Sequence, residues 1–176
     1  MKKIILSAAI AVLFLSACNQ KAEITAKTID TTATLLERNK QTALNSDLAF
    51  NKHDVEASVK DYAAGFVEYG NGSGKVMKNI DSIKTSTKEF FTAFPDFKGD
   101  DFHVFAAGDT VIITGVWTGT FKSEFMKIKP TGKSFKAPDA DIFTFNKEGK
   151  ITSHRNIQSN STFFVQLGIP IPAKKK

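Results

Sequence analysis

The residues best suited to chemistry lie on two short segments in the C-terminal half of the chain. Asp139, Asp141 and Phe143 are spaced by two, and His154 and Asn156 repeat that spacing in a later segment. If both segments are strands, each set lies on one face of a sheet. A carboxylic acid that faces an apolar interior loses hydration, and this favours proton transfer near neutral pH. We therefore predict Asp141 and His154 as catalytic residues, with Asp139 as the second choice for the acid.

Each of these residues also has an ordinary structural interpretation. Asp139 or Asp141 could hydrogen-bond loop amides where the strand begins, and a single histidine on a strand is often structural or exposed. The chain holds 16 Phe against 2 Tyr and 1 Trp, which predicts a large apolar interior built from rings. If that interior is packed solid, these residues have structural roles. If it is hollow, they can bind a ligand or act on it. In that case we expect the ligand-binding residues to be the following: Tyr62, Trp117, Phe121, Phe143 and Asn156.

Several kinds of site find no support in the sequence. The three histidines, His53, His103 and His154, lie far apart without paired-ligand spacing, so we expect no metal site and no cofactor. The segment Gly70–Lys75 lacks the spacing of a phosphate-binding loop. Basic residues give a pI near 9.3, but they form no stripe interleaved with aromatic residues, so we expect no nucleic-acid partner.

The N-terminus has the pattern of a bacterial lipoprotein signal. Lys2 and Lys3 precede an apolar run that ends in Leu15-Ser16-Ala17-Cys18, a candidate lipobox with the only cysteine of the chain. The apolar run is too short to span a bilayer, so we expect a removable signal over 1–17. Cleavage and lipidation of Cys18 would place the protein in the cell envelope, anchored to a membrane and facing the periplasm or the exterior.

Helices are predicted in the first half of the chain. Residues 18–32 are polar without a clear apolar period, and they predict a short tether that leads into the first helix. Apolar residues then recur at helical spacing to about Asn51, and Asp54 can cap a second, short helix. A third helix is predicted over 79–94 and ends before Pro95.

Strands are predicted in the second half. After Pro95 the apolar period changes to two, with a hairpin turn at 107–109 and another at 146–149. Helices followed by an antiparallel meander indicate an α+β domain, here over residues 33–169, followed by a basic tail over 170–176. We find no internal repeat and no second domain.

Six motifs between about residues 90 and 168 occur in an order that resembles a known family. They are Phe94-Pro95-Asp96-Phe97, Trp117-Thr118-Gly119-Thr120-Phe121, Pro130-Thr131-Gly132-Lys133-Ser134-Phe135, Asp141-Ile142-Phe143-Thr144-Phe145, Gly149-Lys150-Ile151 with His154-Arg155, and Gln166-Leu167-Gly168. The chain resembles the SnoaL-like, polyketide cyclase-like group of the nuclear transport factor two-like superfamily. The resemblance implies a cone-shaped fold in which a strongly curved antiparallel sheet wraps round three N-terminal helices and leaves a pocket at the wide end.

The resemblance leaves three functions open. In the resembling cyclases an aspartate from the region of Asp141 acts as acid and base, but they commonly carry histidine where this chain has Phe121. We therefore expect a pocket that binds a small apolar or amphipathic molecule. The alternatives are a cofactor-independent isomerase, cyclase or lyase that uses Asp141, and a non-catalytic envelope module that forms a homodimer through its sheet.

Overall fold

The computed structural model describes residues 13–71 and 76–170 of the chain. It divides into two units, residues 1–35 and 36–176, and each is described by itself. Most of the expected signal, residues 72–75 of the glycine-rich segment and residues 171–176 of the basic tail lie outside the described residues. Among the described residues, no helix has the length and apolar character needed to cross a bilayer.

The first unit differs in secondary structure from the predicted tether. Helix α1 (Leu13–Asn51) begins upstream of Cys18 and includes all of residues 18–32, which were expected to form a tether that precedes the first helix. A run of 39 residues without proline or glycine contains no helix breaker, so polarity alone was a poor indicator of a linker. Residues 31–35 are exposed.

The second unit contains the end of α1 and three further helices. Asp54 caps α2 as predicted, because its side chain accepts a hydrogen bond from the Ala57 amide at 3.0 Å. Asn79 caps α3 in the same way, and Pro95 follows its end. The bounds of the three helices are α2 (Val55–Val59), α3 (Ile80–Ala93) and α4 (Asn160–Leu167).

Five strands form one sheet in the order β1-β5-β4-β3-β2. The strands β2 to β5 are the predicted antiparallel meander, and Gly108, with φ of +60°, makes the turn between β2 and β3. Strand β1 instead pairs in parallel with β5, which the sequence analysis did not predict. The bounds are β1 (Tyr62–Glu68), β2 (Lys98–Ala107), β3 (Thr110–Thr120), β4 (Ser134–Phe145) and β5 (Ile151–Asn156).

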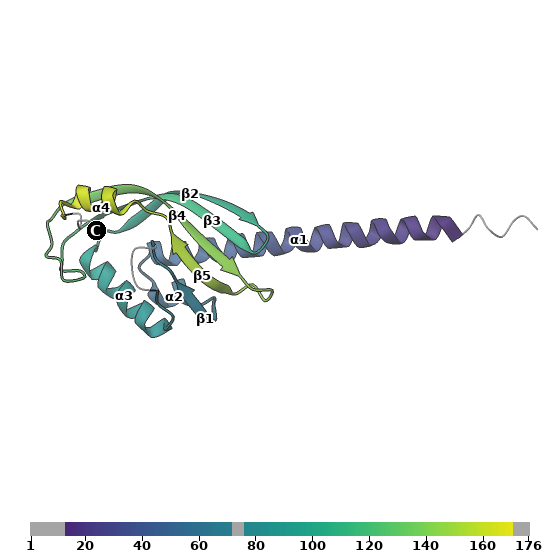
Figure 1. Cartoon of the computed structure of the whole chain (residues 1–176), viewed down its shortest axis with the longest axis horizontal. Helices are drawn as coiled ribbons and strands as arrows, with labels where there is room; N and C mark the ends of the chain where they lie inside the picture. Colours follow the sequence, from purple (N-terminus) through teal and green to yellow (C-terminus); the bar gives the residue numbers. More distant parts are fainter. Residues whose placement is uncertain (1–12, 72–75, 171–176) are drawn as a thin grey trace, which may run out of the picture. The chain divides into compact units, whose positions relative to one another are not determined.

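The helices cover one face of the curved sheet, as Figure 1 shows for α2 and α3. Burial alternates along β4, with Asp139, Asp141, Phe143 and Phe145 on the buried face, which confirms the predicted strand parity. Two apolar clusters lie between the layers. One contains Phe94 with buried residues of β3, β4 and α4, and the other contains Phe66 with buried residues of β3, β4 and β5. The α+β cone predicted from the resemblance is therefore confirmed.

Candidate functional site

The interior of the cone is hollow. A cavity of about 570 Å³ lies inside the second unit and is lined by residues of α1, β1, α3, β3, β4, β5 and α4. Cavities that bind small molecules have volumes of about 300–1,000 Å³ and mostly apolar walls. Here phenylalanine rings supply much of the wall, including Phe50, Phe90, Phe94, Phe121, Phe135 and Phe163.

One region of the cavity wall is polar and contains His154 between two carboxylates. The Nε2 atom of His154 lies 3.0 Å from Oδ1 of Asp141, and Nδ1 lies 2.8 Å from Oε2 of Glu68. The β4–β5 register places His154 opposite Phe143, and the parallel β1–β5 register places Glu68 opposite His154. Three strands thus bring these three polar side chains together at the cavity.

The geometry favours the doubly protonated form of His154. Each ring nitrogen faces a carboxylate oxygen, so both nitrogens must donate for both contacts to be hydrogen bonds. Burial opposes the charged ring, but the negative charge of Glu68 and the hydrogen bonds to Asp141 and Glu68 outweigh it and raise the pKa of His154 well above its ordinary value. The contacts and the raised pKa thus both favour an imidazolium at His154, which would fix the Asp141 carboxylate and balance its charge.

A second polar pair lies beside this group. The Nδ2 atom of Asn156 donates to Oδ2 of Asp139 at 3.1 Å, and the Ala140 amide donates to its Oδ1 at 2.7 Å. Burial, with a smaller contribution from the charge of Asp141, raises the pKa of the Asp139 carboxyl. One oxygen of Asp139 thus binds a backbone amide, but that amide belongs to strand β4 and not to a loop.

Sequence reasoning missed a third aspartate, Asp47, on the part of α1 that belongs to the second unit. The residue is 6% exposed and lines the cavity, and its Oδ2 atom has no hydrogen-bond partner among the described residues. Burial first, and then the charge of Asp141, raise the pKa of this carboxyl well above its ordinary value. The helical spacing carried a signal, because Asp47 lies four residues after buried Ala43 and three before Phe50.

Glu68 was also missed as a site residue. It has the same strand parity as Phe66, which is fully buried, so its inward position was readable from β1. Its partner, His154, could not be predicted from the sequence, because the parallel pairing of β1 with β5 joins residues that are 86 positions apart.

All seven residues predicted for catalysis or ligand binding line the same cavity. Trp117 is 4% exposed and stacks on Phe97 with ring centroids 4.9 Å apart, so it is both a core residue and part of the wall. Phe121 stacks on Phe94 at 5.2 Å. Tyr62 stacks on Phe66 at 3.8 Å, and burial raises the pKa of its hydroxyl. The structure therefore brings the predicted residues together around one space.

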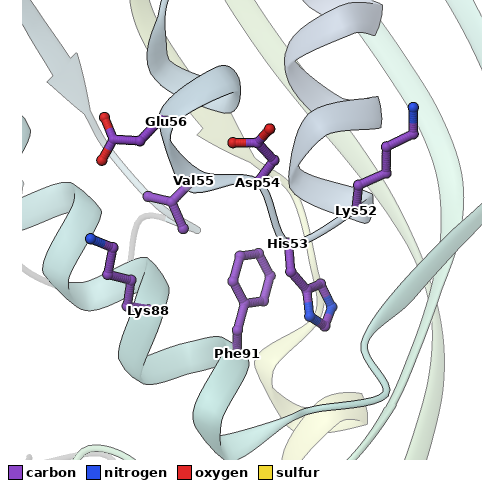
Figure 2. A pocket seen from close by; sticks show the side chains of 7 residues that line it. All are labelled: Lys52, His53, Asp54, Val55, Glu56, Lys88 and Phe91. Atoms are coloured by element: carbon purple, nitrogen blue, oxygen red, sulfur yellow. The ribbon is translucent and has the colours of Figure 1, made fainter.

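A second hollow, of about 500 Å³, lies at the turn between α1 and α2 and is shown in Figure 2. It contains His53, whose ring stacks on Phe91 at 4.1 Å while Nε2 contacts the Phe97 carbonyl oxygen at 2.9 Å. Exposed charged side chains surround it, among them Lys52 and Lys88. We attribute a structural role to His53, since its ring and one nitrogen are engaged in holding the turn.

Residues 13–71 and 76–170 contain no set of three or more His, Cys, Asp or Glu side chains arranged to hold a metal ion.

Comparisons with known proteins agree with this architecture. A family model described as SnoaL-like polyketide cyclase matches residues 41–167. Among curated proteins, none matches the sequence. The solved structures that resemble the chain are less than 25% identical to it, so they support its fold and not its function.

Three of these structures illustrate the similarity. A candidate polyketide cyclase from Xanthomonas campestris pv. campestris is 18% identical with a TM-score of 0.69, covering 76% of this chain and 98% of its own. A candidate SnoaL-like polyketide cyclase from Jannaschia sp. CCS1 is 19% identical with a TM-score of 0.68, covering 78% and 96%. A phenazine biosynthesis-related protein from Pseudomonas aeruginosa is 15% identical with a TM-score of 0.66, covering 84% and 96%.

Proposed function

We propose, from the premise that this chain belongs to the SnoaL-like polyketide cyclase family, that its cavity binds a small molecule with an apolar body and a polar end. The observation that carries this proposal is the 570 Å³ cavity with phenylalanine walls and a polar group at Asp141 and His154. Apolar walls give affinity through buried area, and a few placed polar groups give orientation.

A pair of serine variants on α3 tests the proposal. Ser86 is half-buried and lines the cavity, whereas Ser82 lies one turn away and is exposed. Native mass spectrometry of protein purified without denaturant should show a bound organic molecule in the natural chain and in Ser82→Phe, and none in Ser86→Phe. Equal occupancy in both variants, or no bound molecule in the natural chain, would count against the cavity as a binding site.

A second candidate is cofactor-independent acid–base catalysis, as in an isomerase, cyclase or lyase. The contact between Asp141 and His154 favours it, because the contact fixes the orientation of a carboxylate that lies at the cavity wall. Asp141 would take a proton from a carbon beside a carbonyl group and return it at another position. Phe121 cannot replace the histidine that resembling cyclases carry, so this chemistry depends on Asp141.

Deuterium exchange at the α-carbons of 2-tetralone, followed by NMR, tests the catalytic candidate. Replacing Asp141 by Asn keeps the shape and removes the base, so exchange should slow by about a hundredfold or more. Exposed Asp109 provides the control, and Asp109→Asn should exchange at the natural rate. Exchange that is equally fast in Asp141→Asn would reject Asp141 as the base.

Lipidation of Cys18 and a place in the bacterial cell envelope are further parts of the proposal. They rest on the sequence Leu15-Ser16-Ala17-Cys18 after an apolar run. In a bacterial host the full chain should partition into detergent with a mass increase on Cys18. Cys18→Ser should lose both properties, and an unlipidated natural chain would refute the anchor.

Self-association through the outer face of the sheet completes the proposal. Phe105 and Ile112 lie opposite each other on β2 and β3, and they are 58% and 36% exposed. Such exposed apolar pairs favour burial against another surface. Sedimentation at micromolar concentration should give a dimer that Phe105→Lys dissociates, whereas a monomeric natural chain would contradict this part.

A further inference from the structure

The polar region of the cavity contains more acidic than basic groups. Its lining includes the carboxyl groups of Asp47, Glu68, Asp139 and Asp141, with His154 as the only basic side chain. No Lys or Arg belongs to this lining among the described residues, although the chain contains 24 of them. Even if Asp47 and Asp139 each keep a proton, two carboxylates face the single positive charge of His154.

Three of the four carboxyl groups already have polar partners. Glu68 accepts from the Gly70 amide and from His154, and Asp141 accepts from His154. Asp139 accepts from Asn156 and from the Ala140 amide. Each of these carboxyl groups is therefore stabilised within the protein.

Asp47 is the exception. The residue lines the cavity and is 6% exposed, and its Oδ2 atom is buried without a hydrogen-bond partner among the described residues. A buried carboxyl oxygen without a partner costs free energy, and the nearby negative groups increase that cost. A donor that also carries positive charge would remove both costs at once.

We infer that the cavity binds an amphipathic amine, whose ammonium group donates to the carboxyl group of Asp47 and whose apolar body lies against the phenylalanine rings. The inference rests on the proposed function and narrows its ligand class. The rings suit such a body, because aromatic faces attract organic cations as well as apolar groups. A carboxylate or phosphate ligand would meet the same acidic groups with repulsion.

Three probes with one apolar body separate these ligand classes. They are 4-phenylbutylamine, which is cationic, 4-phenylbutan-1-ol, which is neutral, and 4-phenylbutyrate, which is anionic. Trp117 is the only tryptophan of the chain and lines the cavity, so its emission reports occupancy in the full chain. A charged donor should make the amine bind about ten- to a hundredfold more tightly than the alcohol, and the anion should bind most weakly.

A matched pair of variants assigns the preference to Asp47. Asp47→Asn should remove most of the preference for the amine over the alcohol, and the exposed Asp109→Asn should retain it. Alcohol binding equal to or tighter than amine binding would overturn the amine inference while leaving the ligand-binding function intact. A preference that survives in Asp47→Asn would also overturn it, and failure of all three probes to change Trp117 emission would overturn both proposals.

Discussion

His154 and His53 show how differently the same side chain is used in two regions of this domain. Each ring lies beside a phenylalanine, with centroids 4.7 Å from Phe143 for His154 and 4.1 Å from Phe91 for His53. His154 contacts two carboxylates at a cavity wall, whereas His53 contacts one backbone carbonyl at an open turn. The partners of the ring nitrogens, rather than burial or stacking, distinguish the functional candidate from the structural residue.

The hollows that contain these histidines give the same lesson. Their volumes are similar, at about 570 and 500 Å³, so size does not identify the site. The cavity at His154 has aromatic walls and buried acids, whereas exposed charged residues surround the hollow at His53, as Figure 2 shows. Water stabilises the charged form of an ionisable group, whereas an apolar cavity does not. Strongly perturbed pKa values are therefore expected for acids in an apolar cavity.

The largest expected difference between the two histidines is in stability. His154→Phe removes the cation between two buried carboxylates, so the free energy of unfolding should fall by about 3 kcal/mol. Urea unfolding at pH 6 measures it. A loss no greater than that of His53→Phe would show that the carboxylates do not depend on His154.

A smaller effect is expected in the pH dependence of stability around Asp47. The folded state raises the pKa of Asp47 and Asp139 above 3.8 and that of His154 above 6.5. The folded protein therefore holds these protons more tightly, and its free energy of unfolding should fall as pH rises from about 4, with the His154 part lost above 6.5.

Asp47→Asn isolates one part of this dependence. At pH 7 the variant should be more stable than the natural chain by about 1–2 kcal/mol, because it no longer buries a titrating carboxyl without a partner. The gain should become smaller near pH 4, because the unfolded state of the natural chain then takes up this proton as well. A difference that is the same at both pH values would contradict a raised pKa for Asp47.

The smallest effect is expected at His53. His53→Phe keeps a ring against Phe91 and loses one hydrogen bond to the Phe97 carbonyl, so unfolding should become easier by about 1 kcal/mol. Amine binding, measured through Trp117 emission, should stay unchanged. Loss of binding in this variant would place the ligand in the hollow at His53 and not in the cavity at His154, which would contradict our proposal.

Strand parity made much of the fold and site predictable. Alternation placed Asp141 with Phe143 on the buried face of β4, and the short turn after β4 placed β5 beside it, which brought in His154 and Asn156. These inferences need only local sequence, because a hairpin joins neighbours in the chain.

Non-local pairing accounts for what the sequence analysis missed. Glu68 reaches His154 through a parallel contact between β1 and β5, which local alternation does not encode. Asp47 lies on a helix that is rich in polar residues. The sequence alone therefore did not distinguish this buried acid from the exposed polar residues of α1. Polarity also hid the helical character of residues 18–32.

A crystal structure with bound 4-phenylbutylamine tests the central claim most directly. The account predicts the compound in the cavity, with its phenyl ring among residues such as Phe94 and Phe121 and its nitrogen within hydrogen-bond distance of Asp47. A compound seated beside His53 instead, or a cavity closed by collapsed phenylalanine rings, would contradict it.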